Sequence, residues 1–275
     1  MPSNTPRADK AVQRDAARQK ALALRAAQAK AAKRTRILVI SLLVVAVAAL
    51  AVVFIWILSQ GKPDATSLDS KHPLKGVTAP AGALSNGSIP VGAKGTAGST
   101  SPASAVVVSV YYDYMCPYCA KFEAANAGAL DKMVAAGQVT VEYHPVAFLD
   151  QQSQGSKYST RAVQAVAYVA DADPAHFVAF HEALLADQPA EGTTGLSDAQ
   201  IVAVAVKAGV PQATADKITT GGATFAKWVA GATQQAVLDK VTGTPTVLIN
   251  GKATASTLDL YSAGPLEAAI LAAKG

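Results

Sequence analysis

The chain has 275 residues, a hydrophobic content of 51% and a formal net charge of +5. Residues 1–36 hold ten Lys or Arg and two Asp, whereas the remainder holds 14 basic and 17 acidic residues. The basic balance therefore belongs to one end and does not indicate a nucleic-acid partner, and two cysteines are too few for a disulfide-rich scaffold.

An uninterrupted apolar block covers residues 37–58, in which Ser41 is the only polar residue. A helix of this length, at about 1.5 Å per residue, would be about 33 Å long, enough to cross a hydrocarbon core about 30 Å thick. A cleaved signal peptide is the alternative, but its apolar region is normally about 7–15 residues long and is followed by a small-residue cleavage site. The sequence therefore predicts an uncleaved, single-pass transmembrane helix in the lipid bilayer.

The charges that flank this block predict its orientation. Three basic residues precede it closely: Lys33, Arg34 and Arg36. The other end has only Lys62 nearby, followed by Asp64. By the positive-inside rule, we expect residues 1–36 to form a cytoplasmic basic tail and residues 59–275 to lie outside the cytoplasm, anchored in the cell membrane.

The next segment, residues 59–104, is rich in Gly, Pro, Ser and Ala. This composition predicts a mostly flexible linker, with one edge strand near residues 88–91. The folded domain is expected over residues 105–275.

The first elements of that domain alternate between strand and helix. Residues 105–112 are almost continuously apolar, with β-branched and aromatic side chains, and predict a central, buried strand. Residues 121–136 predict a helix that ends at Gly137. Residues 138–143 alternate between polar and apolar and predict a second strand, so that a parallel β-α-β pair is expected.

A helical insertion is predicted over about residues 150–240, where apolar side chains recur at helical spacing. Residues 246–250 then predict a strand, and Asn250-Gly251 is a strong hairpin signal. Residues 265–273 predict a closing helix. This order indicates an α/β fold with a mixed sheet interrupted by a helical subdomain.

The two cysteines lie three residues apart, in the segment Cys116-Pro117-Tyr118-Cys119 between the first strand and the first helix. At a helix N-terminus, unpaired N–H groups and the helix dipole favour a thiolate, and proline is tolerated in the first turn. We expect Cys116 to be the reactive thiol and Cys119 the less exposed, resolving thiol of disulfide exchange. A structural disulfide is the alternative, but so short a loop would stabilise the fold little.

No metal site is expected here, because a single C-x-x-C supplies two ligands and no histidine pair lies at ligand spacing near it. If the helix terminus lowers the pKa of Cys116 by about three units, the reduced form gains about 4 kcal/mol. For a two-electron couple this raises the reduction potential by roughly 90 mV. Stabilising the thiolate therefore favours an oxidant.

A second signal is Gly243-Thr244-Pro245-Thr246, which leads into the last long strand. A proline at the start of a buried strand suggests a cis bond, and a plain turn is the alternative. Three features together resemble the DsbA-like branch of the thioredoxin superfamily: DYMCPYC at 113–119, the helical insertion between the two strand blocks, and GTPTVLINGK at 243–252. The resemblance covers about residues 86–275.

The resemblance implies a thioredoxin-like mixed sheet with an inserted helical subdomain and a redox-active disulfide between Cys116 and Cys119. Four further residues would belong to the site: Pro117 and Tyr118 in support, and Thr244 and a cis Pro245 in substrate binding. The backbone of Thr244 would pair with an extended peptide. No metal or organic cofactor is implied. The partners would be exported proteins with free thiols or disulfides and a membrane redox partner of the DsbB or VKOR type.

The chain departs from this family pattern at two positions. Tyr118 stands where many relatives have His, which predicts a milder oxidant, and Val110 stands where many have a buried acid, six residues before the first cysteine. Glu123 and Glu142 are candidate substitutes, although we interpret both as surface acids. His144 is interpreted as structural.

The leading functional hypothesis is an extracytoplasmic protein-disulfide oxidoreductase that oxidises the thiols of exported proteins. One alternative is a reductase or isomerase kept reduced by a membrane donor. Another is a non-catalytic binding module tethered to the membrane. C-P-Y-C also occurs in glutaredoxins, but that class lacks a long helical insertion.

Overall fold

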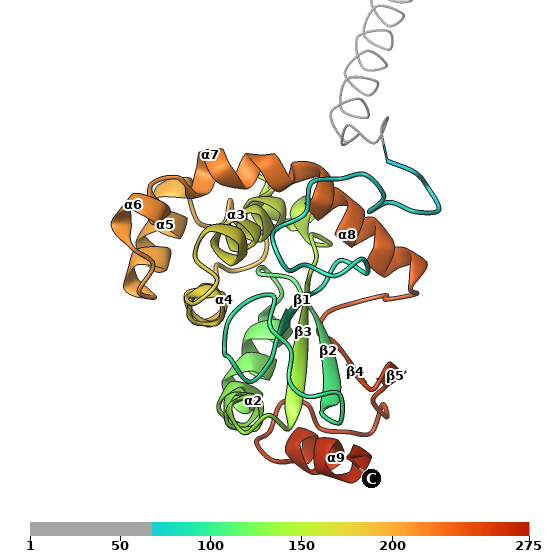
Figure 1. Ribbon diagram of the computed structural model, residues 1–275. Helices are drawn as coiled ribbons and strands as arrows, with labels where there is room; N and C mark the ends of the chain where they lie inside the picture. Colours follow the sequence, from blue (N-terminus) through green and yellow to red (C-terminus); the bar gives the residue numbers. More distant parts are fainter. Residues whose placement is uncertain (1–67, 275) are drawn as a thin grey trace, which may run out of the picture. The chain divides into compact units, whose positions relative to one another are not determined.

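The computed structural model describes residues 68–274, which form a five-stranded mixed sheet surrounded by helices (Figure 1). The strand order is β1-β3-β2-β4-β5. The central pair, β2 (Val106–Tyr112) and β3 (Val139–Pro145), is parallel, as the sequence predicts. Every other pairing in this sheet is antiparallel.

The central strands are buried because their neighbours cover both faces. Val108, Val110 and Tyr112 of β2 belong to the main apolar core. Tyr111, which points to the opposite face, belongs to a smaller cluster with Val146 and with residues from the end of the helical insertion. Continuous apolar character is expected for a strand with both faces covered.

Helix α2 (Pro117–Ala135) joins the two parallel strands and packs against the core through Phe122, Leu130 and Met133. It begins four residues earlier than the sequence pattern indicates. The predicted C-terminal residue Gly137 takes a positive φ of 67° immediately after the helix. This is the conformation that favours glycine at a helix end.

The helical insertion lies between β3 and β4, where it was predicted, and Figure 1 shows its helices gathered at one end of the sheet. The elements are η2 (Asp150–Ser153), α3 (Tyr158–Ala172), α4 (Phe177–Ala186), α5 (Asp198–Lys207), α6 (Gln212–Ala215), α7 (Ile218–Gly222), η3 (Ala223–Phe225) and α8 (Ala226–Leu238).

The chain then returns to the sheet through a hairpin and a closing helix. Strands β4 (Thr246–Ile249) and β5 (Lys252–Ala253) are joined by Asn250 and Gly251, which have positive φ angles of 48° and 75°. This confirms the hairpin signal in the sequence. Helix α9 (Pro265–Ala273) lies at the end of the sheet away from the insertion (Figure 1).

The Gly- and Pro-rich segment before β2 differs from a free linker over the part that the structure describes. It contributes β1 (Ile89–Val91), which pairs with β3 and matches the predicted edge strand. It is also tied to the insertion, since the Ala81 N–H donates to the Asp171 carboxylate at 2.8 Å. Glycine is needed here for close backbone approach: a Cβ on Gly82 would lie 2.4 Å from the Cα of Gly98. Packing therefore explains a composition that we interpreted as flexibility.

The predicted tail at 1–36 and the predicted transmembrane helix at 37–58 lie outside the described residues. Within residues 68–274, no helix combines the length and the apolar character needed to span a membrane.

Candidate active site

The two cysteines lie where β2 meets α2. Cys116 is the N-cap residue, with an extended backbone (φ −81°, ψ 114°), and Pro117 occupies the first helical position. The N–H of Cys119 donates to the Cys116 carbonyl at 2.9 Å. Both thiols are free, and the exposed fraction is 6% for Cys116 and 0% for Cys119. Both residues are thus buried, but Cys116 keeps a small exposed area and borders a groove, whereas Cys119 is fully enclosed.

The surroundings shift the pKa values of the two cysteines in opposite directions, which favours a thiolate at Cys116 and a protonated thiol at Cys119. A hydrogen bond from the Cys119 side chain is the largest influence on Cys116 and lowers its pKa from 9.0 to about 6, against the effect of burial. The Thr244 side chain and the N–H groups of Cys119 and Tyr118 act in the same direction. Burial and the adjacent Cys116 sulfur raise the pKa of Cys119 well above its ordinary value. At neutral pH the negative charge therefore resides on Cys116.

The segment before β4 lies directly against Cys116. The Thr244–Pro245 peptide bond is cis, as the family resemblance implies. When Cys116 is protonated, its thiol donates to the Thr244 carbonyl at 3.1 Å. Ionisation removes that donor, which leaves this carbonyl available to an N–H group of a bound peptide.

A buried carboxylate that sequence reasoning missed lies three residues before Cys116. Asp113 is fully buried and accepts hydrogen bonds from Met115 N (2.9 Å), Leu149 N (2.9 Å) and the Ser159 hydroxyl (2.7 Å). Burial raises the pKa of Asp113 from 3.8 to about 6 although these bonds oppose the shift. The residue ties the cysteine loop to the segment after β3 and to α3. The available signal was the acid in the DYMC motif itself.

The interpretation of Glu123 as a surface acid is wrong. It is buried, one turn after Cys119 on α2, and its Oε2 lies 3.6 Å from His181 Nε2. His181 is fully buried and its Nδ1 lies 2.8 Å from the Tyr114 hydroxyl. These polar groups are buried among apolar side chains of α4. The i, i+4 spacing between Cys119 and Glu123 was the sequence signal that could have predicted a buried Glu123, because residues at this spacing share one face of a helix.

The other acid and histidine considered from the sequence lie on β3. Glu142 is half-buried and its Oε2 is 3.5 Å from His144 Nε2, while His144 is buried and stacks on Tyr111 at 4.2 Å. These contacts agree with a structural role for His144. Neither residue has a described contact with the two cysteines.

Two tyrosines form an exposed aromatic surface beside the cysteines. Tyr118 is 53% exposed and Tyr261 is 45% exposed, with ring centroids 5.6 Å apart. The Lys121 ammonium lies 5.0 Å from the Tyr118 ring. Tyr261 comes from the loop before α9, and no local sequence signal placed it here.

A groove of about 360 Å³ opens beside Cys116. The lining comes from the segment after β3, the α4–α5 loop, the end of α8 and the segment that joins α8 to β4. Its residues are Phe148, Leu149, Glu191, Val237, Val241, Thr242, Gly243 and Thr244, together with Cys116. The groove is mainly apolar and leads to the reactive sulfur. It has the size and character to receive a short peptide segment.

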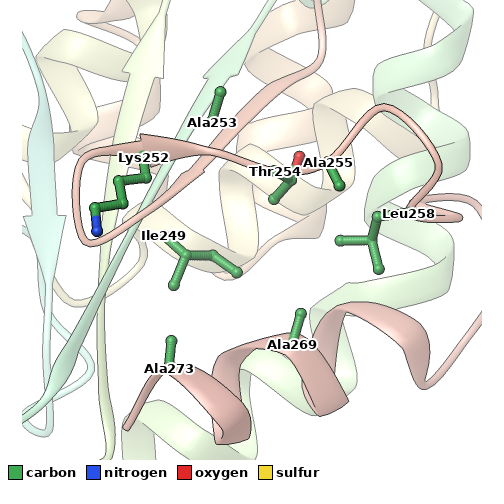
Figure 2. Close-up of a pocket in the computed structure, with 8 residues that line it drawn as sticks. All are labelled: Ile249, Lys252, Ala253, Thr254, Ala255, Leu258, Ala269 and Ala273. Atoms are coloured by element: carbon green, nitrogen blue, oxygen red, sulfur yellow. The ribbon is translucent and has the colours of Figure 1, made fainter. Parts of the chain in front are cut away.

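A second hollow, of about 240 Å³, lies between the β4–β5 hairpin and α9 and contains neither cysteine. Figure 2 shows small and apolar side chains around it, with Lys252 at the hairpin. In the part of the chain that the structure describes, no group of three or more His, Cys, Asp or Glu side chains is arranged to hold a metal ion.

A low-pKa thiol at the start of the helix that follows the central strand, beside a cis-proline loop, defines a thioredoxin-fold protein with a dithiol site. The mixed sheet and its surrounding helices agree with this class. The chain belongs to the thioredoxin family, whose model matches residues 96–263.

The chain is similar to two solved structures and to one curated protein. Reduced DsbA from Mycobacterium tuberculosis is 30% identical, with a TM-score of 0.53; the match covers 68% of this chain and 90% of that one. The reduced disulfide bond oxidoreductase DsbG from the same organism is 31% identical, with a TM-score of 0.53. That match covers 68% of this chain and 85% of DsbG. The serine/threonine-protein kinase PknE of M. tuberculosis is 33% identical over 125 residues. That match covers 44% of this chain but only 22% of the kinase.

Proposed function

We propose that the chain is a thiol–disulfide oxidoreductase that oxidises the thiols of exported proteins by dithiol–disulfide exchange. The observation that carries the proposal is the unequal pair, in which the accessible Cys116 has a pKa of about 6 and the buried Cys119 retains its proton. Similarity to DsbA and DsbG of M. tuberculosis supports this activity.

The proposed reaction starts with a Cys116–Cys119 disulfide. A substrate thiolate attacks the Cys116 sulfur, the enzyme S–S bond breaks, and Cys119 leaves and takes up a proton. A second substrate thiolate then attacks the substrate sulfur of the mixed disulfide and releases Cys116 as a thiolate. The substrate loses two electrons and gains a disulfide, while the enzyme gains two electrons as a dithiol.

The acidity of Cys116 favours this direction. Its pKa lies about three units below 9.0. Such a shift corresponds to about 4 kcal/mol in favour of the reduced pair, or roughly 90 mV. Because each turnover leaves the pair reduced, we propose that a membrane partner of the DsbB or VKOR type reoxidises it. No metal or organic cofactor takes part in the steps proposed.

The direction is tested by the reduction potential of the Cys116/Cys119 pair, measured beside the rate at which the oxidised protein introduces disulfides into a reduced test protein. We expect rapid oxidation and a potential well above that of thioredoxin, about −270 mV. A potential near that value without oxidation would indicate a reductase or isomerase. Retained biological activity of a Cys116→Ser protein would instead indicate a binding module.

We also propose that residues 37–58 anchor the protein in the cell membrane, with 1–36 inside and the dithiol domain outside. The length of the apolar block and the basic residues before it support this proposal. In a variant without Cys116 and Cys119, an impermeant thiol reagent added to intact cells should label Ala65→Cys but not Lys20→Cys. The reverse labelling pattern would refute this topology.

A further inference from the structure

The groove beside Cys116 combines apolar walls with one charge. Phe148, Val237 and Val241 supply apolar side chains, and Val237 is 53% exposed. Apart from the Cys116 thiol, Glu191 has the only ionisable side chain among the residues that line the groove. A segment lying here would therefore meet apolar surface and one carboxylate in the groove that Cys116 also lines.

The loop that carries Glu191 is fixed on its active-site side. It joins α4 to α5, and at its start the Gln188 side-chain amide donates to the Cys116 carbonyl at 2.9 Å. The residue after Glu191 is held as well, since the Gly192 N–H donates to the Gln152 carbonyl at 2.8 Å. The backbone on both sides of Glu191 is thus attached to the body of the domain.

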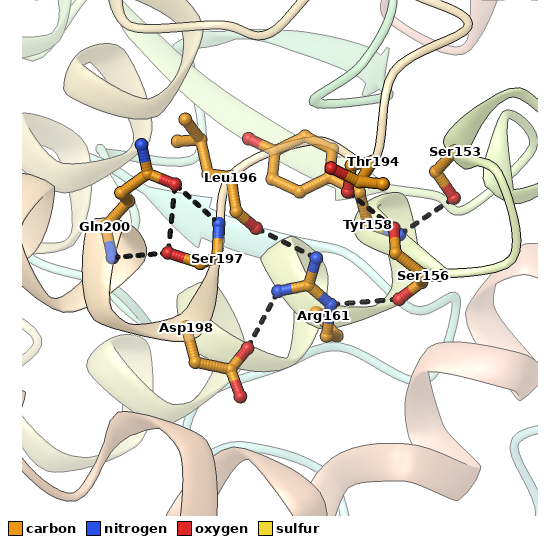
Figure 3. Close-up of polar contacts among 9 residues, drawn as sticks. All are labelled: Ser153, Ser156, Tyr158, Arg161, Thr194, Leu196, Ser197, Asp198 and Gln200. Carbon is orange, nitrogen blue, oxygen red and sulfur yellow. Dashed lines mark hydrogen bonds and ion pairs between the residues drawn. The ribbon is translucent and has the colours of Figure 1, made fainter.

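The far end of the same loop is bound to α3 and to the turn that precedes it, as Figure 3 shows. Arg161 donates to the Leu196 carbonyl at 2.8 Å and pairs with the Asp198 carboxylate at 2.7 Å. The Ser156 hydroxyl donates to the Thr194 carbonyl at 2.6 Å. This anchoring fixes the loop that places the carboxylate at the groove.

We propose that Glu191 is a specificity-determining residue, and that preferred substrates carry Lys or Arg within a few residues of the reactive cysteine, in an otherwise apolar segment. The inference rests on the proposed oxidoreductase function. A cation in the groove is attracted to Glu191, whereas a carboxylate in the same place is repelled. Glu191 is solvent-exposed, so an ion pair here contributes about fivefold, equivalent to about 1 kcal/mol.

The test uses the oxidised full chain and two-cysteine peptides that differ only in one residue, Lys, Gln or Glu, placed in turn at positions flanking the first cysteine. The ratio of kcat/KM for the Lys peptide to that for the Glu peptide should exceed about fivefold at one position or more. It should fall toward one as added salt shortens the screening length from about 10 Å to about 3 Å.

Three variants make the test specific to the groove. Glu191→Gln should reduce the Lys/Glu ratio to near one, and Glu191→Lys should invert it. Asp187→Asn is the matched control, because Asp187 lies on the same loop but pairs with Lys207 and does not line the groove, so this variant should keep the wild-type ratio.

The two proposals fail in different ways. If the wild-type chain oxidises no peptide, including the Gln peptide, the oxidoreductase function is wrong. If it oxidises the Gln peptide but treats the Lys and Glu peptides alike, or if Asp187→Asn alters the ratio as much as Glu191→Gln does, the role of Glu191 is overturned.

Discussion

The hydroxyl of Thr244 offers a sharp test of how this site controls Cys116. The Thr244 side chain is one of the groups that lower the pKa of the Cys116 thiol, after the larger contribution of Cys119. Thr244→Val removes the hydroxyl, nearly preserves the side-chain volume and leaves the backbone carbonyl in place. We expect the thiolate to lose one hydrogen bond while the rest of the site is retained.

The size of the effect follows from the strength of that bond. A hydrogen bond to a charged group contributes about 1.5–3 kcal/mol, and one pKa unit corresponds to about 1.4 kcal/mol. The pKa of Cys116 should therefore rise from about 6 by roughly one to two units. The reduction potential should fall by roughly 30–60 mV, since the reduced form loses the same stabilisation.

The assay is the rate of alkylation of the reduced protein as a function of pH, because only a thiolate reacts. The wild-type rate should be half-maximal near pH 6 and fall below it, as Cys116 becomes protonated. Thr246→Val is the matched control, because the Thr246 hydroxyl donates to the Gly243 carbonyl at 2.7 Å and does not act on the thiol. Identical profiles for Thr244→Val and wild type, or an equal shift in the control, would refute the reasoning.

Three further predictions concern the cysteines and the buried acid. Cys119→Ala should accumulate mixed disulfides with substrates at Cys116, seen on non-reducing gels, whereas Cys116→Ala should form none. In denaturant titrations, the unfolding free energy of the reduced protein should rise by up to about 4 kcal/mol from about pH 6 to pH 9. The reason is that Cys116 is already a thiolate in the native state over this range but is still protonated in the unfolded state. The oxidised protein has no such thiol and should lack this rise. The raised pKa of Asp113 acts in the opposite direction: the unfolding free energy of the oxidised wild-type protein should fall by up to about 3 kcal/mol as pH rises from about 4 to about 6. An Asp113→Asn protein should not show this fall, and an equal fall in that variant would exclude Asp113 as its cause.

The features that were predictable from the sequence depend on short-range signals. The buried strand that leads into Cys116 and the Asn250-Gly251 hairpin each follow from a few consecutive residues. The cis bond before Pro245 came from the family resemblance. The thiol pair could be placed at a helix N-terminus because strand and helix patterns meet there.

The features that were missed depend on contacts between distant segments. Tyr261 comes to the cysteines from the loop before α9, and Gln188 reaches the Cys116 carbonyl from the loop after α4. Neither residue has a local pattern that distinguishes it from surface residues. The Gly-rich segment before β2 was misleading because glycine serves flexibility and close packing alike.

The bonds of Asp113 have a mechanical consequence. One carboxylate holds the loop of the reactive thiol, the segment after β3 and, through Ser159, the first long helix of the insertion. A hinge that swung the insertion away from the sheet would have to break the bonds to Leu149 and Ser159 together and leave a buried carboxylate without these donors. We therefore expect the two parts to move as one rigid body during turnover. Substrates of different shape would then be accommodated by rotation of exposed side chains such as Tyr118 and Val237, without domain closure.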